Sequence, residues 1–253
     1  MRDVDDFEGA SRSGAAARRE KPVAAQVAAR AFRLAGPTST MDAATAALRE
    51  AIIRGDIGAG ERLVESALTE SMGVSRNTIR EVFRLLETER LVVRETNRGV
   101  FVRTLTAADI ADAYHVRRLV EVSSLSEADS VPAGVRRRSI AEMREALDAG
   151  REALEAGDKW GVGLADLQFH AAISELSGSP RLVEIMAGLK TELRLAFAAT
   201  DVILDFHRPY VALNARILEL CEGEDFAGAA DALEDYLHSA EHDLLARLRA
   251  REL

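Results

Sequence analysis

Cysteine and proline are scarce in this chain of 253 residues. Cys221 is the only cysteine, which excludes an internal disulfide framework and fits a reducing compartment such as the cytoplasm. Five prolines, with 47% hydrophobic and 30% charged residues, are typical of a helix-rich soluble protein. No run of about 18 uncharged apolar residues occurs, and the first residues lack an apolar signal segment. We therefore expect a cytoplasmic protein that does not span a membrane.

The motifs of common enzyme classes are also absent. The sequence contains no P-loop, no G-x-S-x-G nucleophile motif and no H-E-x-x-H zinc motif. The single cysteine has no activating motif around it. An enzyme would need a nucleophile with its base, a phosphate-binding glycine loop or a complete metal site. We therefore predict that the chain is not an enzyme.

Positive charge is in deficit over the whole chain, but the deficit is uneven. The net charge is −9. Residues 104–253 carry sixteen basic residues against twenty-seven acidic ones, whereas residues 76–103 carry seven against four. Phosphate groups respond to local charge rather than to the total. Nucleic-acid binding by residues 76–103 is therefore compatible with an acidic protein.

Residues 65 to 88 have the pattern of two short helices joined by a glycine turn. Glu65–Met72 is predicted as the first helix, and Gly73 can adopt the positive φ that ends it. Ser75 is a suitable N-cap for the second helix. Its apolar residues recur at i, i+3, i+4 and i+7, which predicts one buried stripe: Ile79, Val82, Phe83 and Leu86.

The exposed face of the second helix begins with basic and polar side chains. Arg76 and Arg80 lie one turn apart and point the same way, with Asn77 beside them. A helix-turn-helix presents its recognition helix to the major groove in this manner. Two β-prone runs within residues 91–102 flank Asn97-Arg98-Gly99, which predicts a hairpin wing with a basic tip. Periodicity alone leaves open an ordinary helical hairpin with solvated arginines.

Four segments together resemble the winged helix of the GntR family of bacterial regulators. They are residues 58–63, 74–76, 79–81 and 98–102. Thr78 and Ala59 stand where proline is common in that family, and neither change removes a DNA-contacting group. The resemblance implies that seven residues contact DNA: Ser75, Arg76, Asn77, Thr78, Arg80, Arg98 and Gly99.

The predicted fold class is mainly α. Residues 1–37 lack a sustained two-faced pattern, so we predict a mostly disordered N-terminal arm in which residues 23–32 form a transient helix. Residues 38–103 are predicted as a winged helix-turn-helix domain of three helices and a β-hairpin wing. Residues 104–253 are predicted as an all-α helical bundle. Its helices are expected near 107–129, 136–156, 159–176, 180–202, 208–221 and 225–250, with a break around 205–209.

The order of winged helix, short connector and helical bundle resembles the FadR-type branch of the family, which carries an FCD ligand-binding domain. The segments that carry the resemblance are 116–121, 166–170, 177–178 and 225–237. It implies a domain that binds a small effector and joins two copies of the chain. Arg117 is implied to hold a carboxylate, and Arg194 is a second candidate, because a guanidinium can form two parallel hydrogen bonds to a carboxylate. An ion pair with a neighbouring acid, for example Glu121, is the alternative for each arginine.

Asp166 and His170 are four residues apart on one helix face, a spacing that permits joint metal ligation. In many FCD domains two further histidines complete a divalent-metal site, and the resemblance places those positions at Asn214 and Tyr236. Neutral tyrosine is a poor ligand for zinc or nickel. We therefore expect no cofactor, and hydrogen bonds from Asn214, Tyr236 and His170 to the effector. An internal hydrogen-bonded pair of Asp166 and His170 is the structural alternative.

The predicted function is a ligand-responsive transcriptional regulator. We expect a homodimer that binds an inverted repeat in double-stranded DNA, and a repressor that a small organic acid releases. One alternative is a metal-dependent sensor that uses a reduced site around Asp166 and His170. Another is a helical-bundle enzyme, which the missing motifs disfavour.

Overall fold

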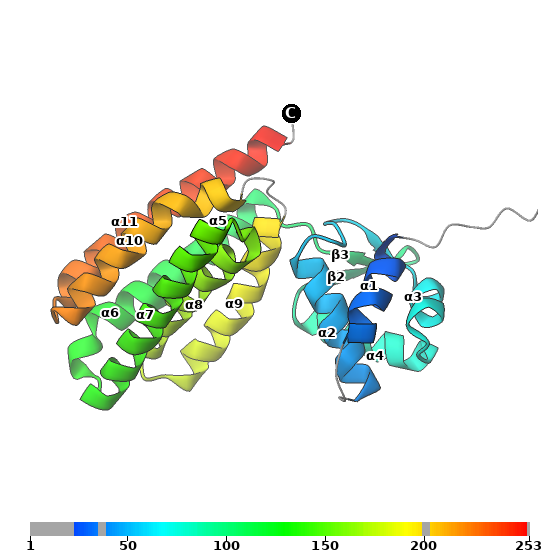
Figure 1. Ribbon diagram of the computed structural model, residues 1–253, viewed down its shortest axis with the longest axis horizontal. Helices are drawn as coiled ribbons and strands as arrows, with labels where there is room; N and C mark the ends of the chain where they lie inside the picture. The colour runs from blue at the N-terminus through cyan, green and yellow to red at the C-terminus, as the bar shows by residue number, and fades with distance from the viewer. Residues whose placement is uncertain (1–22, 35–38, 199–202, 252–253) are drawn as a thin grey trace, which may run out of the picture.

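The N-terminal part of the chain folds as a winged helix-turn-helix domain (Figure 1). The computed structural model describes residues 23–34, 39–198 and 203–251. The strands pair antiparallel in the order β1-β3-β2, with Val92 opposite Val102 and Glu95 opposite Gly99, so the predicted wing is present. The elements of this domain are α1 (Val23–Leu34), α2 (Thr40–Ile53), β1 (Arg62–Leu63), α3 (Glu65–Met72), α4 (Arg76–Thr88), β2 (Val92–Glu95) and β3 (Gly99–Val102).

Local signals determine the two helices of the helix-turn-helix. Gly73 ends α3 in the left-handed conformation with φ of 69°, and its N–H donates to the carbonyl of Thr69. Ser75 caps α4, because its hydroxyl accepts a hydrogen bond from the Thr78 N–H at 3.0 Å. The predicted apolar stripe of α4 is buried: Ile79, Val82, Phe83 and Leu86. The predicted turn, cap and buried face are confirmed.

Helix α1 is a packed helix, whereas only a transient helix was predicted over residues 23–32. Residues 23–34 form an α-helix that packs against α2 and α3. Its buried face consists of small side chains: Ala24, Ala25, Ala28 and Ala29. An isolated helix of 12 residues is marginal in water, so contact with the rest of the domain stabilises α1. Residues 1–22 and 35–37 of the predicted arm lie outside the described residues.

The C-terminal domain is a bundle of helices. Thr106 starts its first helix with a capping box that Asp109 closes. The single helix predicted over 107–129 is interrupted by a π-helical turn. Within the described residues, none of the helices is long and apolar enough to cross a membrane. The elements are α5 (Ala107–Arg117), the π turn η1 (Arg118–Val122), α6 (Ser123–Ser126), the 3-10 turn η2 (Ala128–Ser130), α7 (Ala133–Ala156), α8 (Lys159–Glu175), α9 (Pro180–Ala198), α10 (Ile203–Glu222) and α11 (Phe226–Arg251).

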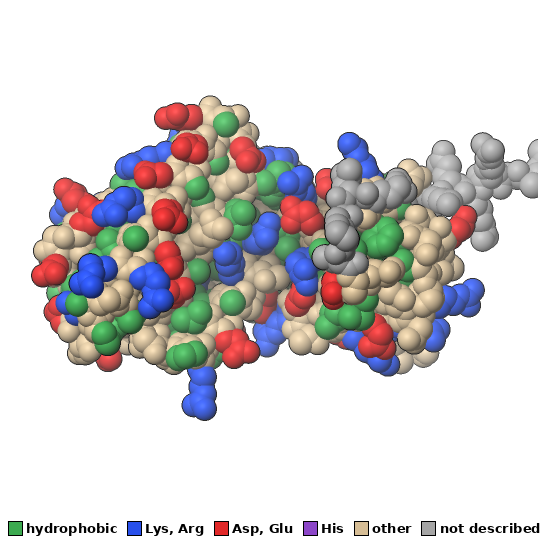
Figure 2. Space-filling view, turned by 60° about the horizontal axis from the view of Figure 1, so that its bottom comes forward, with side chains coloured by type: hydrophobic (Ala, Val, Ile, Leu, Met, Phe, Trp, Pro, Cys, Tyr) green, Lys and Arg blue, Asp and Glu red, His purple; other side chains and the backbone are tan. Residues whose placement is uncertain are grey.

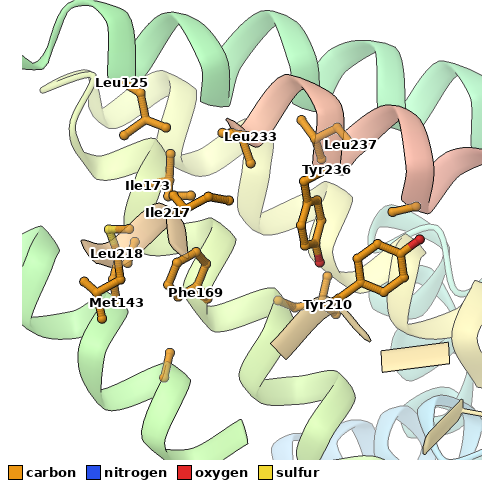
Figure 3. Packing of buried hydrophobic residues seen from close by; sticks show 14 of the residues in the cluster. Leu125, Met143, Phe169, Ile173, Tyr210, Ile217, Leu218, Leu233, Tyr236 and Leu237 are labelled. Carbon is orange, nitrogen blue, oxygen red and sulfur yellow. The ribbon is translucent and has the colours of Figure 1, made fainter. Parts of the chain in front are cut away.

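Aliphatic and aromatic side chains fill the centre of the bundle (Figure 3). Met143 of α7, Phe169 of α8, Ile217 of α10 and Leu233 of α11 are all completely or almost completely buried. Burying one such side chain contributes about 1.5–3 kcal/mol. This core fixes which faces of α8, α10 and α11 meet, and the same faces carry the polar residues of the candidate site.

Helix α10 begins earlier than predicted. A break was expected at 205–209 because proline disrupts helix interiors, yet α10 runs from Ile203 through Pro209. Phe206 and His207 on this turn are buried, so their packing offsets the hydrogen bond that Pro209 cannot make. His207 and Asn214 consequently lie seven residues apart on one face of α10, two helical turns from each other.

Helix α9 contacts both domains. Leu193 and Phe197, four residues apart, are buried in the core of the bundle. Leu195 lies on the opposite side of α9 and is buried in the core of the winged domain. The two hydrophobic cores therefore meet along one helix, which Figure 1 shows on the side of the bundle that faces the winged domain.

Ion pairs accompany this hydrophobic contact. Glu192 of α9 binds Arg90 at 3.1 Å and Arg103 at 2.8 Å, and Arg103 also binds Asp109 of α5 at 2.7 Å. Figure 2 shows acidic and basic side chains next to one another where the domains meet. Cavities of about 480 Å³ and 580 Å³ lie at this boundary.

Candidate functional site

The first turn of α4 presents most of the predicted DNA contacts to solvent. Thr78 is half-buried, and its hydroxyl lies 2.8 Å from that of Ser75, so these two groups stabilise the helix start. The Nε–H of Arg80 donates to Glu65 of α3 at 3.0 Å. No ion-pair partner holds Arg76 within the part of the chain that the structure describes. The exposed residues of this turn are Ser75, Arg76, Asn77 and Arg80.

The wing places a second basic group beside the recognition helix. Arg98 is exposed at the turn, pairs with Glu95 and lies with its guanidinium carbon 5.3 Å from the centre of the Phe101 ring. Gly99 has φ of 116°, which disfavours any other residue. A Cβ at Gly99 would also lie 3.2 Å from Nε of Arg62. The backbone conformation and the Arg62 side chain therefore both require glycine at this position.

Arg62 was not predicted as a DNA contact, although the fold brings it to the wing. It is exposed on β1 and pairs with Phe101 of β3. Its position in the 58–63 segment of the family pattern was the available signal. A strand of two residues cannot be recognised from periodicity, so its pairing with β3 was not predictable.

A chain of charged groups is buried in the bundle. Nε–H of Arg117 donates to Oε1 of Glu121 at 2.8 Å, so the ion pair that the sequence left open is formed. Oε2 of Glu121 lies 2.7 Å from Nδ1 of His170. Burial by itself would raise the pKa of the Glu121 carboxyl, but Arg117 and His170 hold it below its ordinary value. An ionised carboxylate only accepts hydrogen bonds, so Nδ1–H of His170 is the donor.

Asp166 organises a second group of buried side chains. Its Oδ1 accepts hydrogen bonds from Nδ2 of Asn214 at 2.9 Å and from the hydroxyl of Tyr236 at 2.8 Å. Burial would raise the pKa of Asp166, but His170, His207, Arg117 and the Tyr236 hydroxyl hold it below its ordinary value. Tyr236 and Tyr210 lie close together in Figure 3, with ring centres 4.9 Å apart. Asp166 and His170 form no direct hydrogen bond, because Nε2 of His170 is 3.9 Å from Oδ1.

His207 of α10 completes this cluster and was missed by the sequence analysis. Its Nδ1 lies 3.8 Å from Oδ2 of Asp166, and burial lowers its pKa despite that carboxylate. The predicted break at 205–209 had placed His207 outside the helix. Its spacing of seven residues from Asn214 was the signal that could have found it.

Several atoms of the cluster have no hydrogen-bond partner. They are Nη2 of Arg117, Nε2 of His170, both ring nitrogens of His207 and Oδ1 of Asn214. All four residues are at most 3% exposed. Buried polar atoms are seldom left unpaired in folded proteins, so these atoms mark a place where a polar ligand can bind.

Arg194 does not lie with the other predicted effector residues. Its guanidinium points toward the winged domain, 3.9 Å from Glu50 of α2. Leu193 and Phe197 face the bundle, whereas Arg194 lies on the side of α9 that turns toward α2. Apolar neighbours in the sequence suggested a buried guanidinium, but they belong to a helix shared by two cores.

The cluster does not fit a resident metal ion. Among the described residues, no group of three or more His, Cys, Asp or Glu side chains is arranged to hold one. Oδ1 of Asp166 already accepts two hydrogen bonds, and the Tyr236 hydroxyl donates rather than ligates. Burial, together with the Asp166 charge, raises the pKa of Tyr236 well above its ordinary value, so it does not supply a phenolate ligand.

Family models and known proteins match both domains. Residues 40–102 match the bacterial regulatory proteins of the gntR family, and residues 112–239 match the FCD domain. An uncharacterized HTH-type transcriptional regulator of Streptomyces ambofaciens is 31% identical over 80% of this chain and 84% of its own length. A probable D-xylose utilization operon transcriptional repressor of Paenarthrobacter nicotinovorans is 29% identical over 68% of this chain and 77% of its own.

A solved structure has the same fold. The crystal structure of a GntR transcriptional regulator from Rhodococcus sp. RHA1 is 37% identical in sequence, with a TM-score of 0.74. The match covers 83% of this chain and 99% of that one. These relatives are transcriptional regulators rather than enzymes. The recognition helix, the wing and the helical domain agree with them, and the chain belongs to the GntR family of DNA-binding transcriptional regulators with an FCD domain.

Proposed function

We propose that this protein is a cytoplasmic repressor that binds an inverted repeat in double-stranded DNA as a homodimer and is released by a small organic acid. The observation that carries the proposal is a single helix, α9, that contacts both a winged domain and a bundle with unpaired buried polar atoms. One relative, named a probable operon transcriptional repressor, supports the sign of regulation.

A carboxylate is the proposed recognition group of the effector. Glu121 occupies Nε of Arg117 and leaves Nη2 free to donate to an acid. Asn214, Tyr236 and His170 belong to the same buried cluster and supply further hydrogen bonds. An acid that enters this closed cluster displaces helices of the bundle. Displacement of α9 then changes how the two winged domains of a dimer are held, and so their spacing on DNA.

The test is operator binding in the presence of organic acids. A genomic footprint of the tagged protein supplies the operator, and a gel shift at two salt concentrations measures the phosphate contribution to affinity. We expect specific binding to the operator that weakens as the salt concentration rises. We also expect at least one small organic acid to release the protein from the operator. Specific binding that no acid changes would contradict the proposed effector class and leave the DNA-binding function intact.

The proposed dimer leads to a prediction about size and operator. A single recognition helix covers only a few base pairs, which discriminates too little among genomic sites. We expect light scattering at micromolar concentration to give about twice the 27.5 kDa of one chain. Scrambling one half-site should weaken binding at least about 100-fold, because each mismatched base pair costs about 1–3 kcal/mol. A monomer, or one-to-one binding to a single half-site, would rule out the dimer.

We also expect metal to be unimportant for this protein. Elemental analysis after purification without chelator should find far less than one zinc or nickel per chain. Adding either metal should leave the melting temperature nearly unchanged, since a ligand stabilises only the state that binds it. One metal per chain that disappears in both Asp166→Ala and His170→Ala would favour a metal-dependent sensor instead.

A further inference from the structure

The strongest unexplained feature of the bundle is the pair of unpartnered nitrogens on His207. The ring is 1% exposed, and edge-to-face contacts fix it, with ring centres 4.7 Å from Phe197 and 4.9 Å from Phe206. Nε2 faces Gly163, where even a Cβ would come within 3.2 Å. Only Nδ1, on the side of Asp166, has a polar neighbour that a ligand can share.

A single oxygen atom of a ligand can bridge His207 and Asp166. Nδ1 and Oδ2 are 3.8 Å apart, which is too long for a direct hydrogen bond. One oxygen can nevertheless lie about 2.8 Å from both atoms. The ionised carboxylate only accepts, so a bridging group must donate to Asp166. The same negative charge favours the tautomer of His207 with its proton on Nδ1, so a bridging group must also accept.

A hydroxyl group meets both requirements, because it donates one hydrogen bond and accepts others. A methylene group meets neither requirement, and an ammonium group cannot accept. We propose that His207 is a specificity-determining residue that, together with Asp166, binds a hydroxyl of the effector, so that the effector is a hydroxylated organic acid. The proposal rests on the proposed function, in which Arg117 binds the carboxylate of the same ligand.

The test compares acids that differ at a single position. Malate, succinate and aspartate carry a hydroxyl, a hydrogen and an ammonium at the same carbon, and lactate, propionate and alanine form a second set. Gluconate and hexanoate extend the comparison to a longer chain. Calorimetric affinities are measured for the full-length wild type, His207→Phe and His207→Asn, and the melting temperature of each variant confirms that it is folded.

We expect the wild type to bind a hydroxylated acid about 10- to 100-fold more tightly than its deoxy partner, as expected for loss of a hydrogen bond to a charged group. His207→Phe keeps the aromatic packing but should abolish this ratio. His207→Asn keeps an amide close to the position of Nδ1 and should retain part of this affinity ratio. If His207 only packed, His207→Phe would retain more of the preference for the hydroxylated acid than His207→Asn, because phenylalanine preserves the ring.

Each other outcome contradicts a defined part of the account. Equal affinity for hydroxylated and deoxy acids would overturn the role of His207 and leave the organic-acid effector standing. Preference for aspartate or alanine would mean that an ammonium group binds between His207 and Asp166. This result would also overturn the proposed hydroxyl contact. If no acid of the three sets binds or releases operator DNA, the acid effector and the role of His207 are both wrong.

Discussion

Replacement of Arg117 by methionine is expected to destabilise the folded chain by about 3–5 kcal/mol, because Glu121 then remains buried without its cation. Both side chains are essentially inaccessible to solvent, with 1% and 0% of their surface exposed. Water cannot solvate the orphaned carboxylate there, and among the described residues His170 is the one other hydrogen-bond partner of Glu121. Urea unfolding at pH 8 measures the loss.

The matched control is the adjacent residue. Arg118 binds Glu241 at 2.5 Å, but these side chains are 19% and 18% exposed. Solvent screens such a pair, so Arg118→Met should cost about 1 kcal/mol or less. If the two methionine variants lose the same stability, Glu121 is not an ionised partner of Arg117.

The loss in Arg117→Met should shrink as the pH falls from 8 toward 5. In the wild type the pKa of Glu121 is held below its ordinary 4.5, so its contribution to stability is present above that value and is lost at lower pH. In the variant, burial raises the pKa of Glu121 and folding takes up a proton. Stability of the variant therefore increases as pH falls, whereas that of the wild type does not. A loss that is constant with pH would contradict this account.

Arg76→Ala should reduce specific operator affinity by about 1–3 kcal/mol, which corresponds to about 5- to 150-fold. Arg76 is exposed on the first turn of α4, and no ion pair within the described residues competes for it. A bidentate contact to guanine is the common role of an arginine at such a position. Fluorescence anisotropy with the operator and with a scrambled duplex separates specific from non-specific loss.

The control for Arg76 is an arginine with the same charge elsewhere. Arg151→Ala removes an exposed guanidinium from α7, where it pairs with Asp148 in the bundle. It should leave operator affinity within about twofold, since charges beyond a Debye length of about 10 Å are largely screened. Unchanged operator binding by folded Arg76→Ala would exclude the proposed base contact.

Much of the winged domain could be predicted because its signals are local. Gly73, Ser75 and the apolar spacing of α4 each act within one or two helical turns, and the structure places each as expected. The stable packing of α1 was missed because alanine is a weak hydrophobic signal, and only contact with α2 and α3 gives this helix a buried face. Arg62 required a strand pairing between distant residues.

The polar cluster was predicted in part, for a different reason. Asp166, His170, Asn214 and Tyr236 could be placed by their resemblance to known domains, and the structure brings them together. His207 has no counterpart in that pattern. Proline usually interrupts a helix, and no local rule shows that packing of the neighbouring side chains keeps α10 continuous through Pro209.

The position of Leu195 has a consequence for how the protein can be divided. The winged domain ends in sequence at β3, yet its core includes a side chain from a helix almost 100 residues later. A fragment that stops before the bundle has a hole where this leucine packs, and losing a buried leucine costs about 2–5 kcal/mol. The two domains are therefore expected to melt in one cooperative transition. A chimera that joins this winged domain to another bundle must carry its own α9 with it.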